Sequence, residues 1–141
     1  EVRTQDGRTD VTKPKVIRQA LRPETSTKLR GMLASVVENG VAVRAAVPGY
    51  YVGGKTGTAQ VTDHATGRYH PEKKIISFIG FAPVDNPAFI VMIKLANPAG
   101  LSFASGTAAP MFGTLAKQIL EYLRVPPSRP EKHDPLREEK L

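Results

Sequence analysis

The sequence contains no cysteine and no tryptophan, and aromatic residues make up only 6% of its 141 residues. Without cysteine the chain can form no disulfide framework, no thiol nucleophile and no cysteine-ligated zinc site. No apolar stretch approaches the roughly 20 residues of a membrane-spanning helix, and the opening residues Glu1–Arg3 are not typical of a signal peptide. Arginine runs and basic segments interleaved with aromatic residues are also missing, so we expect no nucleic-acid partner.

The residues that are present are typical of a globular domain. Hydrophobic residues make up 40% of the chain and charged residues 23%, with 12 glycines and 12 prolines. This composition is too apolar for general disorder and too often interrupted by glycine and proline for a coiled coil. The net charge is +7, and residues 1–30 hold eight Lys and Arg against four Asp and Glu. The basic excess is therefore an N-terminal bias and not a dense basic stripe.

Two segments predict helices. The first begins at Pro23 and stops at Asn39-Gly40, and its apolar positions follow helical spacing. These positions are Leu29, Met32, Leu33, Val36 and Val37, which we expect to pack on a sheet. The second begins at Pro110 and ends before Pro126-Pro127. Its expected core positions are Met111, Phe112, Leu115, Ile119, Leu120 and Leu123.

Four segments predict strands, namely residues 15–21, 50–61, 75–81 and 88–96. Residues 75–81 are apolar at successive positions, so we expect a central strand covered on both faces. The short turn at residues 85–87 suggests that this strand and the next are antiparallel. The fold class is therefore α/β or α+β, a mainly antiparallel sheet with packed helices.

The two ends of the chain are polar. Residues 1–13 carry the turn signal Asp6-Gly7 and predict a loop or a weak hairpin. Residues 126–141 are rich in proline and charge, and we expect them to form a flexible tail. The domain prediction is thus one folded unit over residues 1–125, followed by that tail.

One segment matches a nucleotide-binding pattern. Residues Gly49–Thr56 fit G-x-x-x-x-G-K-[ST], which requires a helix to begin at the lysine and threonine. Here the following residues, Gly57–Thr62, contain β-branched side chains and favour a strand. No later predicted strand ends in an acidic residue that could support magnesium. A helix beginning at Lys55 would favour this alternative, and an extended strand would contradict it.

The same lysine also begins Lys55-Thr56-Gly57, a signature of active-site serine enzymes that act on β-lactams and D-alanyl-D-alanine peptides. A strand edge offers backbone groups along which an extended peptide can lie. Lys55 would place a positive charge near the substrate carboxylate, and Thr56 and Thr58 would present two hydroxyls on one face. Gly57 would allow close approach of the backbone. The Thr58 N–H could donate to an oxyanion.

The residues around this tripeptide resemble one family. The run Gly49-Tyr50-x-Val52-x-Gly54 continues into Lys55–Gln60 and resembles the class B penicillin-binding proteins, the monofunctional peptidoglycan D,D-transpeptidases. Residues 78–83, 109–112 and 123–127 continue the resemblance. It implies the penicillin-binding and β-lactamase-like transpeptidase fold, in which a five-stranded sheet lies between helices.

The resemblance also implies a function and a set of site residues. Lys55 and Thr58 would be catalytic, and Thr56, Gly57, Ala59 and Gln60 would bind substrate. The partners would be peptidoglycan stem peptides ending in D-Ala-D-Ala and β-lactam antibiotics, with no cofactor and no metal. The protein would serve cell division or cell shape at the extracytoplasmic (periplasmic) face of the cell membrane, held by an N-terminal anchor outside this chain.

Two family motifs are missing from the sequence. No serine is followed by lysine three positions later, as Ser-x-x-Lys requires, and none fits Ser-x-Asn. The resemblance implies that both motifs lie before Glu1, in an upstream part of the same transpeptidase domain. We therefore expect this chain alone to be inactive. The alternatives are a β-lactam-sensing receptor domain, which shares Lys-Thr-Gly, and the P-loop protein described above.

Some nearby residues leave their role open. His64 and His70 lie in the polar segment 62–74, and solvated loop histidines are a better interpretation than a metal site. The same segment could shape substrate access. Tyr50 and Tyr51 precede the lysine, and they could either line a groove or pack beneath the strand.

Overall fold

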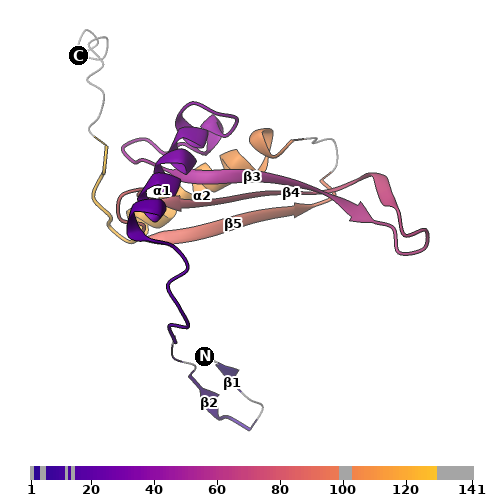
Figure 1. Ribbon diagram of the computed structural model, residues 1–141, viewed down its shortest axis with the longest axis horizontal. Coiled ribbons are helices and arrows are strands. Elements are labelled where there is room, and N and C mark those ends of the chain that lie inside the picture. Colours follow the sequence, from indigo (N-terminus) through magenta and orange to yellow (C-terminus); the bar gives the residue numbers. More distant parts are fainter. Residues whose placement is uncertain (1, 4–5, 12, 14, 99–102, 130–141) are drawn as a thin grey trace.

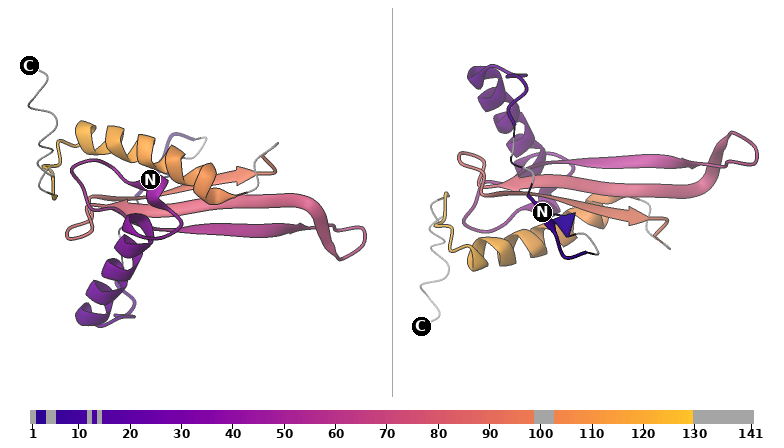
Figure 2. Two further views of the ribbon diagram at one scale, coloured as in Figure 1. Left: turned by 90° about the horizontal axis from the view of Figure 1, so that it is seen from above. Right: turned by 90° about the horizontal axis from the view of Figure 1, so that it is seen from below.

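The computed structural model describes residues 2–3, 6–11, 13, 15–98 and 103–129 of the chain. Its centre is a three-stranded antiparallel sheet of order β3-β4-β5, with β3 at Gly53–Thr62, β4 at Tyr69–Ala82 and β5 at Phe89–Ala96. Helix α2 (Ala108–Tyr122) lies on one face of the sheet, and helix α1 (Pro23–Glu38) stands on the other (Figure 2). Short 3-10 turns, η1 (Val43–Ala45) and η2 (Ala104–Gly106), join these elements. The predicted layered fold of an antiparallel sheet with packed helices is confirmed.

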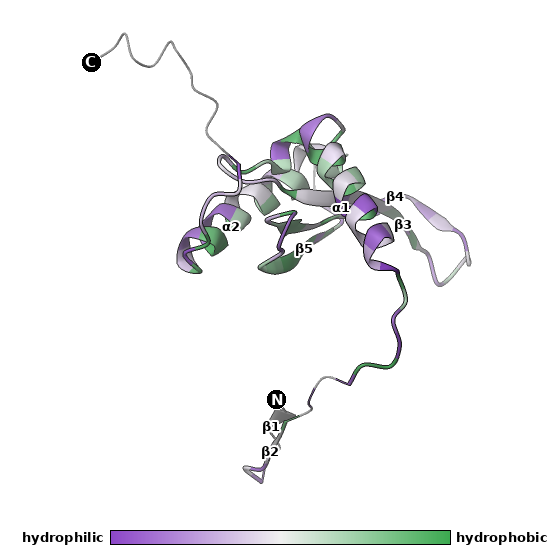
Figure 3. Cartoon of the chain, turned by 60° about the vertical axis from the view of Figure 1, so that its left-hand side comes forward, coloured by the Kyte–Doolittle hydropathy of each residue, from purple (hydrophilic) through white to green (hydrophobic). Residues whose placement is uncertain are grey.

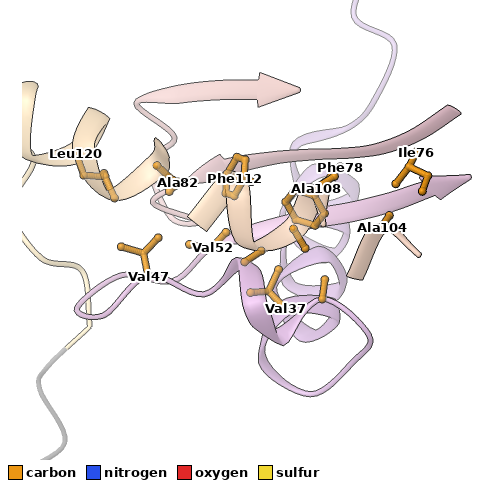
Figure 4. Close-up of a cluster of buried hydrophobic side chains, with 14 residues drawn as sticks. Val37, Val47, Val52, Ile76, Phe78, Ala82, Ala104, Ala108, Phe112 and Leu120 are labelled. Carbon is orange, nitrogen blue, oxygen red and sulfur yellow. The ribbon is translucent and has the colours of Figure 1, made fainter. Parts of the chain in front are cut away.

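The hydrophobic core lies between β4 and α2. Phe78 of β4 and Phe112 of α2 are fully buried, with ring centroids 4.9 Å apart and ring planes tilted by 58° (Figure 4). Ile76 and Leu120 extend this layer. Because side chains alternate along a strand, the even-numbered residues of β4 enter this core. The odd-numbered ones face the side where α1 stands.

Helix α1 packs through its C-terminal end. Val37 is buried, whereas Met32 remains 64% exposed and Leu29 41% exposed. The expectation that the whole apolar stripe packs on the sheet is therefore wrong for its N-terminal part, because the helix leans away from the sheet there (Figure 2). Arg30 ties this helix to the turn between β4 and β5 by donating to the Val84 and Asp85 carbonyl oxygens at 3.2 and 2.7 Å.

Helix α2 begins two residues before the predicted start at Pro110. Phe112 and Leu120 are core residues as predicted, but Met111, Leu115 and Leu123 are exposed. Small residues of the helix are buried instead, namely Ala108, Ala109, Gly113 and Ala116, and Gly113 lies against the backbone of Arg44 and Ala45 in η1. The helix thus approaches closely through a face that a search for large apolar side chains does not detect.

The predicted strand over residues 15–21 is wrong. These residues have no regular secondary structure, and Val16 and Ile17 are 88% and 82% exposed. Their β-branched side chains favour a strand only where a neighbouring strand or a core is available, and here the segment runs away from the sheet (Figure 1). The weak hairpin predicted at the N-terminus is present, as β1 (Val2–Arg3) paired with β2 (Thr9–Asp10).

Strand β4 is central, as predicted, but only one of its faces is fully covered. Ile79 is 44% exposed, and its neighbours on β5, Ile90 and Met92, are 67% and 57% exposed. These three residues lie on the face opposite α2 and are called the open face below. Hydrophobic colouring along β5 is visible in Figure 3. Three strands of this sheet lie within the described ranges, against the five that the resemblance implies.

The first residues of the predicted tail are bound to the domain. The Ser128 and Arg129 N–H groups both donate to the Gly49 carbonyl oxygen at 3.0 Å. Arg129 also pairs with Glu38 at 2.8 Å, and both side chains are partly buried. Residues 126–129 therefore differ from the flexible tail expected there, while residues 130–141 lie outside the described part of the chain. The boundary at residue 125 stays a prediction.

Candidate active-site strand

All six predicted site residues lie on β3, an edge strand of the sheet. Strand β3 pairs with β4 from Gly53↔Phe81 to Gln60↔Lys74, and no described strand pairs with its outer edge. Lys55 is therefore in extended structure and does not begin a helix. This contradicts the P-loop alternative, since the pattern places phosphate at a helix N-terminus.

Lys55 is exposed, and its ammonium group lies close to the neighbouring threonine. Nζ donates to the Thr56 carbonyl oxygen at 3.1 Å and to Thr56 Oγ1 at 3.3 Å. A cation and a hydroxyl thus lie together beside a strand edge. Ammonium and hydroxyl groups are both donors suited to an anionic oxygen, so this pair can bind a carboxylate.

The two threonines lie on one face of β3, as predicted from their spacing. Thr56 is directly opposite Phe78 and Thr58 is opposite Ile76, both on β4. Thr56 is half-buried, whereas Thr58 is exposed. The two hydroxyls therefore differ in their access to solvent, and a ligand along the outer edge reaches Thr58 more freely.

Gly57 lies between the threonines, directly opposite Ser77. A Cβ atom added to Gly57 would lie 2.6 Å from Ser77 Oγ. The strand therefore has no room for a side chain here unless Ser77 rotates. Sequence reasoning did not identify Ser77 as a neighbour of the site, because only the register of β3 against β4 brings it there.

Ala59 and Gln60 are exposed near the far end of the strand. They lie opposite Ile75 and Lys74 of β4. Beyond Gln60 the register shifts before the next pair, Thr62↔Tyr69. The hairpin then projects past the rest of the sheet (Figure 1).

The two tyrosines before the strand have structural partners. Tyr50 donates its hydroxyl to the Val125 carbonyl oxygen at 2.6 Å and packs against the core. The ring of Tyr51 lies under the guanidinium of Arg129, 5.0 Å from its centroid. Of the two interpretations left open, the structure supports packing for Tyr50, whose hydroxyl is bound and whose side chain lies against the core.

The tip of the hairpin is organised by Asp63. Its carboxylate accepts from the Ala65 N–H at 2.9 Å and from Thr66 Oγ1 at 3.1 Å. The Ala65 N–H and then the Thr66 hydroxyl lower the pKa of Asp63 below its ordinary value. Within the ranges that the structure describes, no three His, Asp or Glu side chains gather as metal ligands would.

Comparisons with known proteins agree on the family. The family model described as the penicillin binding protein transpeptidase domain matches residues 2–121. Stage V sporulation protein D of Bacillus subtilis is 42% identical over 113 residues, which are 79% of this chain and 17% of that protein. A probable peptidoglycan D,D-transpeptidase, PbpC of Pseudomonas aeruginosa, is 38% identical over 115 residues, 79% of this chain and 20% of that protein.

Solved structures give the same result. Penicillin-binding protein 3 from Mycobacterium tuberculosis in complex with ampicillin has a TM-score of 0.74 and 35% identity, over 94% of this chain and 31% of that one. The apo transpeptidase domain of penicillin-binding protein 3 from Burkholderia pseudomallei has a TM-score of 0.72 and 36% identity, over 88% and 38% of the two chains.

The chain spans about a fifth of the curated relatives that it matches and about a third of the solved chains. The family prediction made from the residues around Lys55 is confirmed, since the family model matches well over half of the chain. This chain belongs to the penicillin-binding protein transpeptidase domain family.

Proposed function

We propose that this chain is part of a serine-type peptidoglycan D,D-transpeptidase and supplies its substrate-binding strand. The observation that carries the proposal is the pairing of Lys55 Nζ with Thr56 Oγ1, 3.3 Å apart, on an edge strand whose outer side is open among the described residues. Relatives named as D,D-transpeptidases, and not as receptors, favour the enzyme over the β-lactam-sensing alternative.

In this proposal each site residue has a role toward the substrate. A stem peptide ending in D-Ala-D-Ala, or a β-lactam, lies along the outer edge of β3. Lys55 and the hydroxyls of Thr56 and Thr58 hold its carboxylate. Gly57 allows the substrate to approach the backbone of β3 closely, and Ala59 and Gln60 bind the peptide farther along the strand. The Thr58 N–H donates to the oxyanion. Loss of one oxyanion donor costs about 3–4 kcal/mol of transition-state stabilisation.

The nucleophile is supplied by a part of the domain that this chain does not contain, which carries Ser-x-x-Lys and Ser-x-Asn. The serine oxygen attacks the penultimate D-alanine carbonyl carbon, and the terminal D-alanine leaves with a proton on its amine. An amine of a neighbouring stem peptide then attacks the acyl-enzyme and releases the serine. Penicillin takes part in the first step and stalls at the second. The chain alone is therefore inactive.

We also propose a location at the extracytoplasmic face of the cell membrane, in cell division or in cell shape. Among the described residues, no helix is both long and apolar enough to cross a bilayer. In this proposal an N-terminal anchor that is not in this chain holds the protein at the membrane.

The test is acylation by a fluorescent penicillin, followed by intact mass, on the chain assembled with the serine-bearing part. Lys55→Ala should lower the labelling rate by at least about 100-fold, since it removes a charged donor aimed at the substrate. Lys28→Ala, which removes an exposed lysine of α1, is the matched control and should label normally. Equal labelling of the Lys55→Ala and Lys28→Ala proteins would contradict the proposal.

A further inference from the structure

A bulge interrupts the hairpin directly after the proposed substrate-binding residues. Gln60 pairs with Lys74, and the next pair is Thr62 with Tyr69. One residue of β3, Val61, is therefore opposed by four residues of β4, His70–Lys73. In such a bulge the extra residues lose their partners on the neighbouring strand. Glu72 and Lys73 are exposed, so their backbone N–H groups bond either to water or to another acceptor.

His70 supplies that acceptor. Its Nδ1 atom accepts from the Glu72 N–H at 3.3 Å and from the Lys73 N–H at 3.2 Å. Pro71, which lies between His70 and Glu72, has no N–H group that needs an acceptor. A ring nitrogen accepts hydrogen bonds only while it carries no proton. The observed geometry therefore requires the neutral imidazole with its proton on Nε2.

The charges around His70 are mixed. Lys73 and Lys74 follow it on β4, and Arg68 precedes it, whereas Glu72 and Asp63 are acidic. Among the causes that lower the pKa of Asp63, a charge on His70 is the weakest. Protonation of Nδ1 would turn the acceptor into a donor that faces two other N–H donors, so both hydrogen bonds would be lost.

We propose that neutral His70 is a positioning residue for the Gln60–Thr62 end of β3, and that its protonation loosens this end of the strand. Histidine is the side chain that ordinarily changes charge between about pH 5 and 8. The proposal rests on the proposed function, because a substrate lies along this strand only if β3 is the binding edge. His70 acts through the backbone of the bulge and makes no contact with substrate.

Three substitutions separate this role from a general effect on folding. His70→Asn keeps a side-chain oxygen that can accept from backbone N–H groups two or three residues ahead, and it does not titrate. His70→Ala removes the acceptor. His64→Gln is the matched control, because His64 lies in the same hairpin and has no part in the bulge.

Hydrogen exchange read by mass spectrometry on peptides that cover residues 69–75 tests the bulge in the penicillin-labelled domain. At pD 8 the Glu72 and Lys73 amides of the His70→Ala protein should each exchange about five- to tenfold faster than in the wild type, because each amide loses one hydrogen bond. The His70→Asn protein should match the wild type. At pD 5.5 the wild type and the His64→Gln protein should both exchange faster than the His70→Asn protein by a similar factor. If the ratio of the wild-type exchange rate to the His70→Asn exchange rate is the same at both pD values, the proposal is overturned.

The rate of penicillin labelling tests the positioning role. The ratio of the wild-type labelling rate to the His70→Asn labelling rate should be lower at pH 5.5 than at pH 8. The ratio of the wild-type labelling rate to the His64→Gln labelling rate should be the same at both pH values. If the bulge opens as expected but the His70→Ala protein is labelled at the wild-type rate at pH 8, the positioning role is wrong. If Lys55→Ala also has no effect, the proposed function has failed, and the exchange ratios still report on His70 independently.

Discussion

At the scale of single residues, the packing of β3 depends on positions that have no side chain. A Cβ atom added to Gly54 would collide with the ring of Phe78 and lie 2.8 Å from the Ile79 carbonyl oxygen. Gly53 has a similar neighbour in the ring of Phe81, 2.5 Å from the Cβ position. These glycines let aromatic rings of β4 lie against the backbone of the site strand.

Gly54→Ala should therefore destabilise the fold by about 1–3 kcal/mol, because the new methyl group overpacks a core that cannot expand. Gly31→Ala is the matched control. Gly31 lies in α1 with nothing within 4 Å of its Cβ position, and alanine there should stabilise by about 0.5–1 kcal/mol. Urea unfolding of the two variants measures both effects. If Gly54→Ala and Gly31→Ala change the free energy of unfolding equally, the space around Gly54 does not restrict the residue at this position.

At the scale of elements, the sheet and α2 meet through a few large side chains among small ones. Phe112 is fully buried against Phe78, and a Cβ atom at Gly80 would lie 2.7 Å from its ring. Met111, the preceding residue, is 49% exposed. One turn of helix thus contains a residue that holds two elements together and a neighbour of similar hydrophobicity that does not.

Phe112→Ala should lower the free energy of unfolding by about 3–5 kcal/mol, because burial is lost and a cavity is left behind. Met111→Ala should cost about 0.5 kcal/mol or less, since surface substitutions are usually within this range. Thermal unfolding followed by circular dichroism compares the two. A similar loss of stability for both variants would mean that α2 packs on the sheet through another face than the one seen here.

At the scale of the whole molecule, the open face is the least protected surface. Ile79, Ile90 and Met92 present three large apolar side chains on adjacent strands, and no described strand pairs with the outer edge of β5. Contiguous apolar patches and open strand edges both promote association. In the proposed complete domain this face would be covered, whereas the chain alone leaves it in contact with water.

We expect the chain alone to self-associate through this face. The double variant Ile90→Lys/Met92→Lys should shift it toward monomer at the same concentration, because two like charges oppose pairing of the face with itself. Met111→Lys, a change of the same kind on an exposed part of α2, should leave the association unchanged. Sedimentation velocity over a concentration series gives the distribution. If the Ile90→Lys/Met92→Lys and Met111→Lys proteins associate to the same extent, the contact between copies does not lie on the open face.

Much of the fold could be predicted because its signals are local. Pro23 and Asn39-Gly40 mark the two ends of α1 within one or two residues, and β3 and β5 lie within three residues of their predicted bounds. Strand β4 begins at Tyr69, six residues before the predicted start at Ile75, so the expectation of a loop histidine is wrong for His70. Residues 15–21 show the limit of this reasoning. Val16 and Ile17 have strand propensity but no partner strand, and propensity without a partner forms no sheet.

The order of residues along the chain was sufficient to identify the family and to place the candidate site residues on one extended strand, because a motif and its flanks are properties of covalent sequence. Tertiary structure alone decided which apolar residues are buried, since burial depends on what packs opposite each position. It also brought Ser77 opposite Gly57 and left four residues of β4 facing Val61. The role of His70 as an acceptor follows only from that register, because a bulge exists only where two strands are paired.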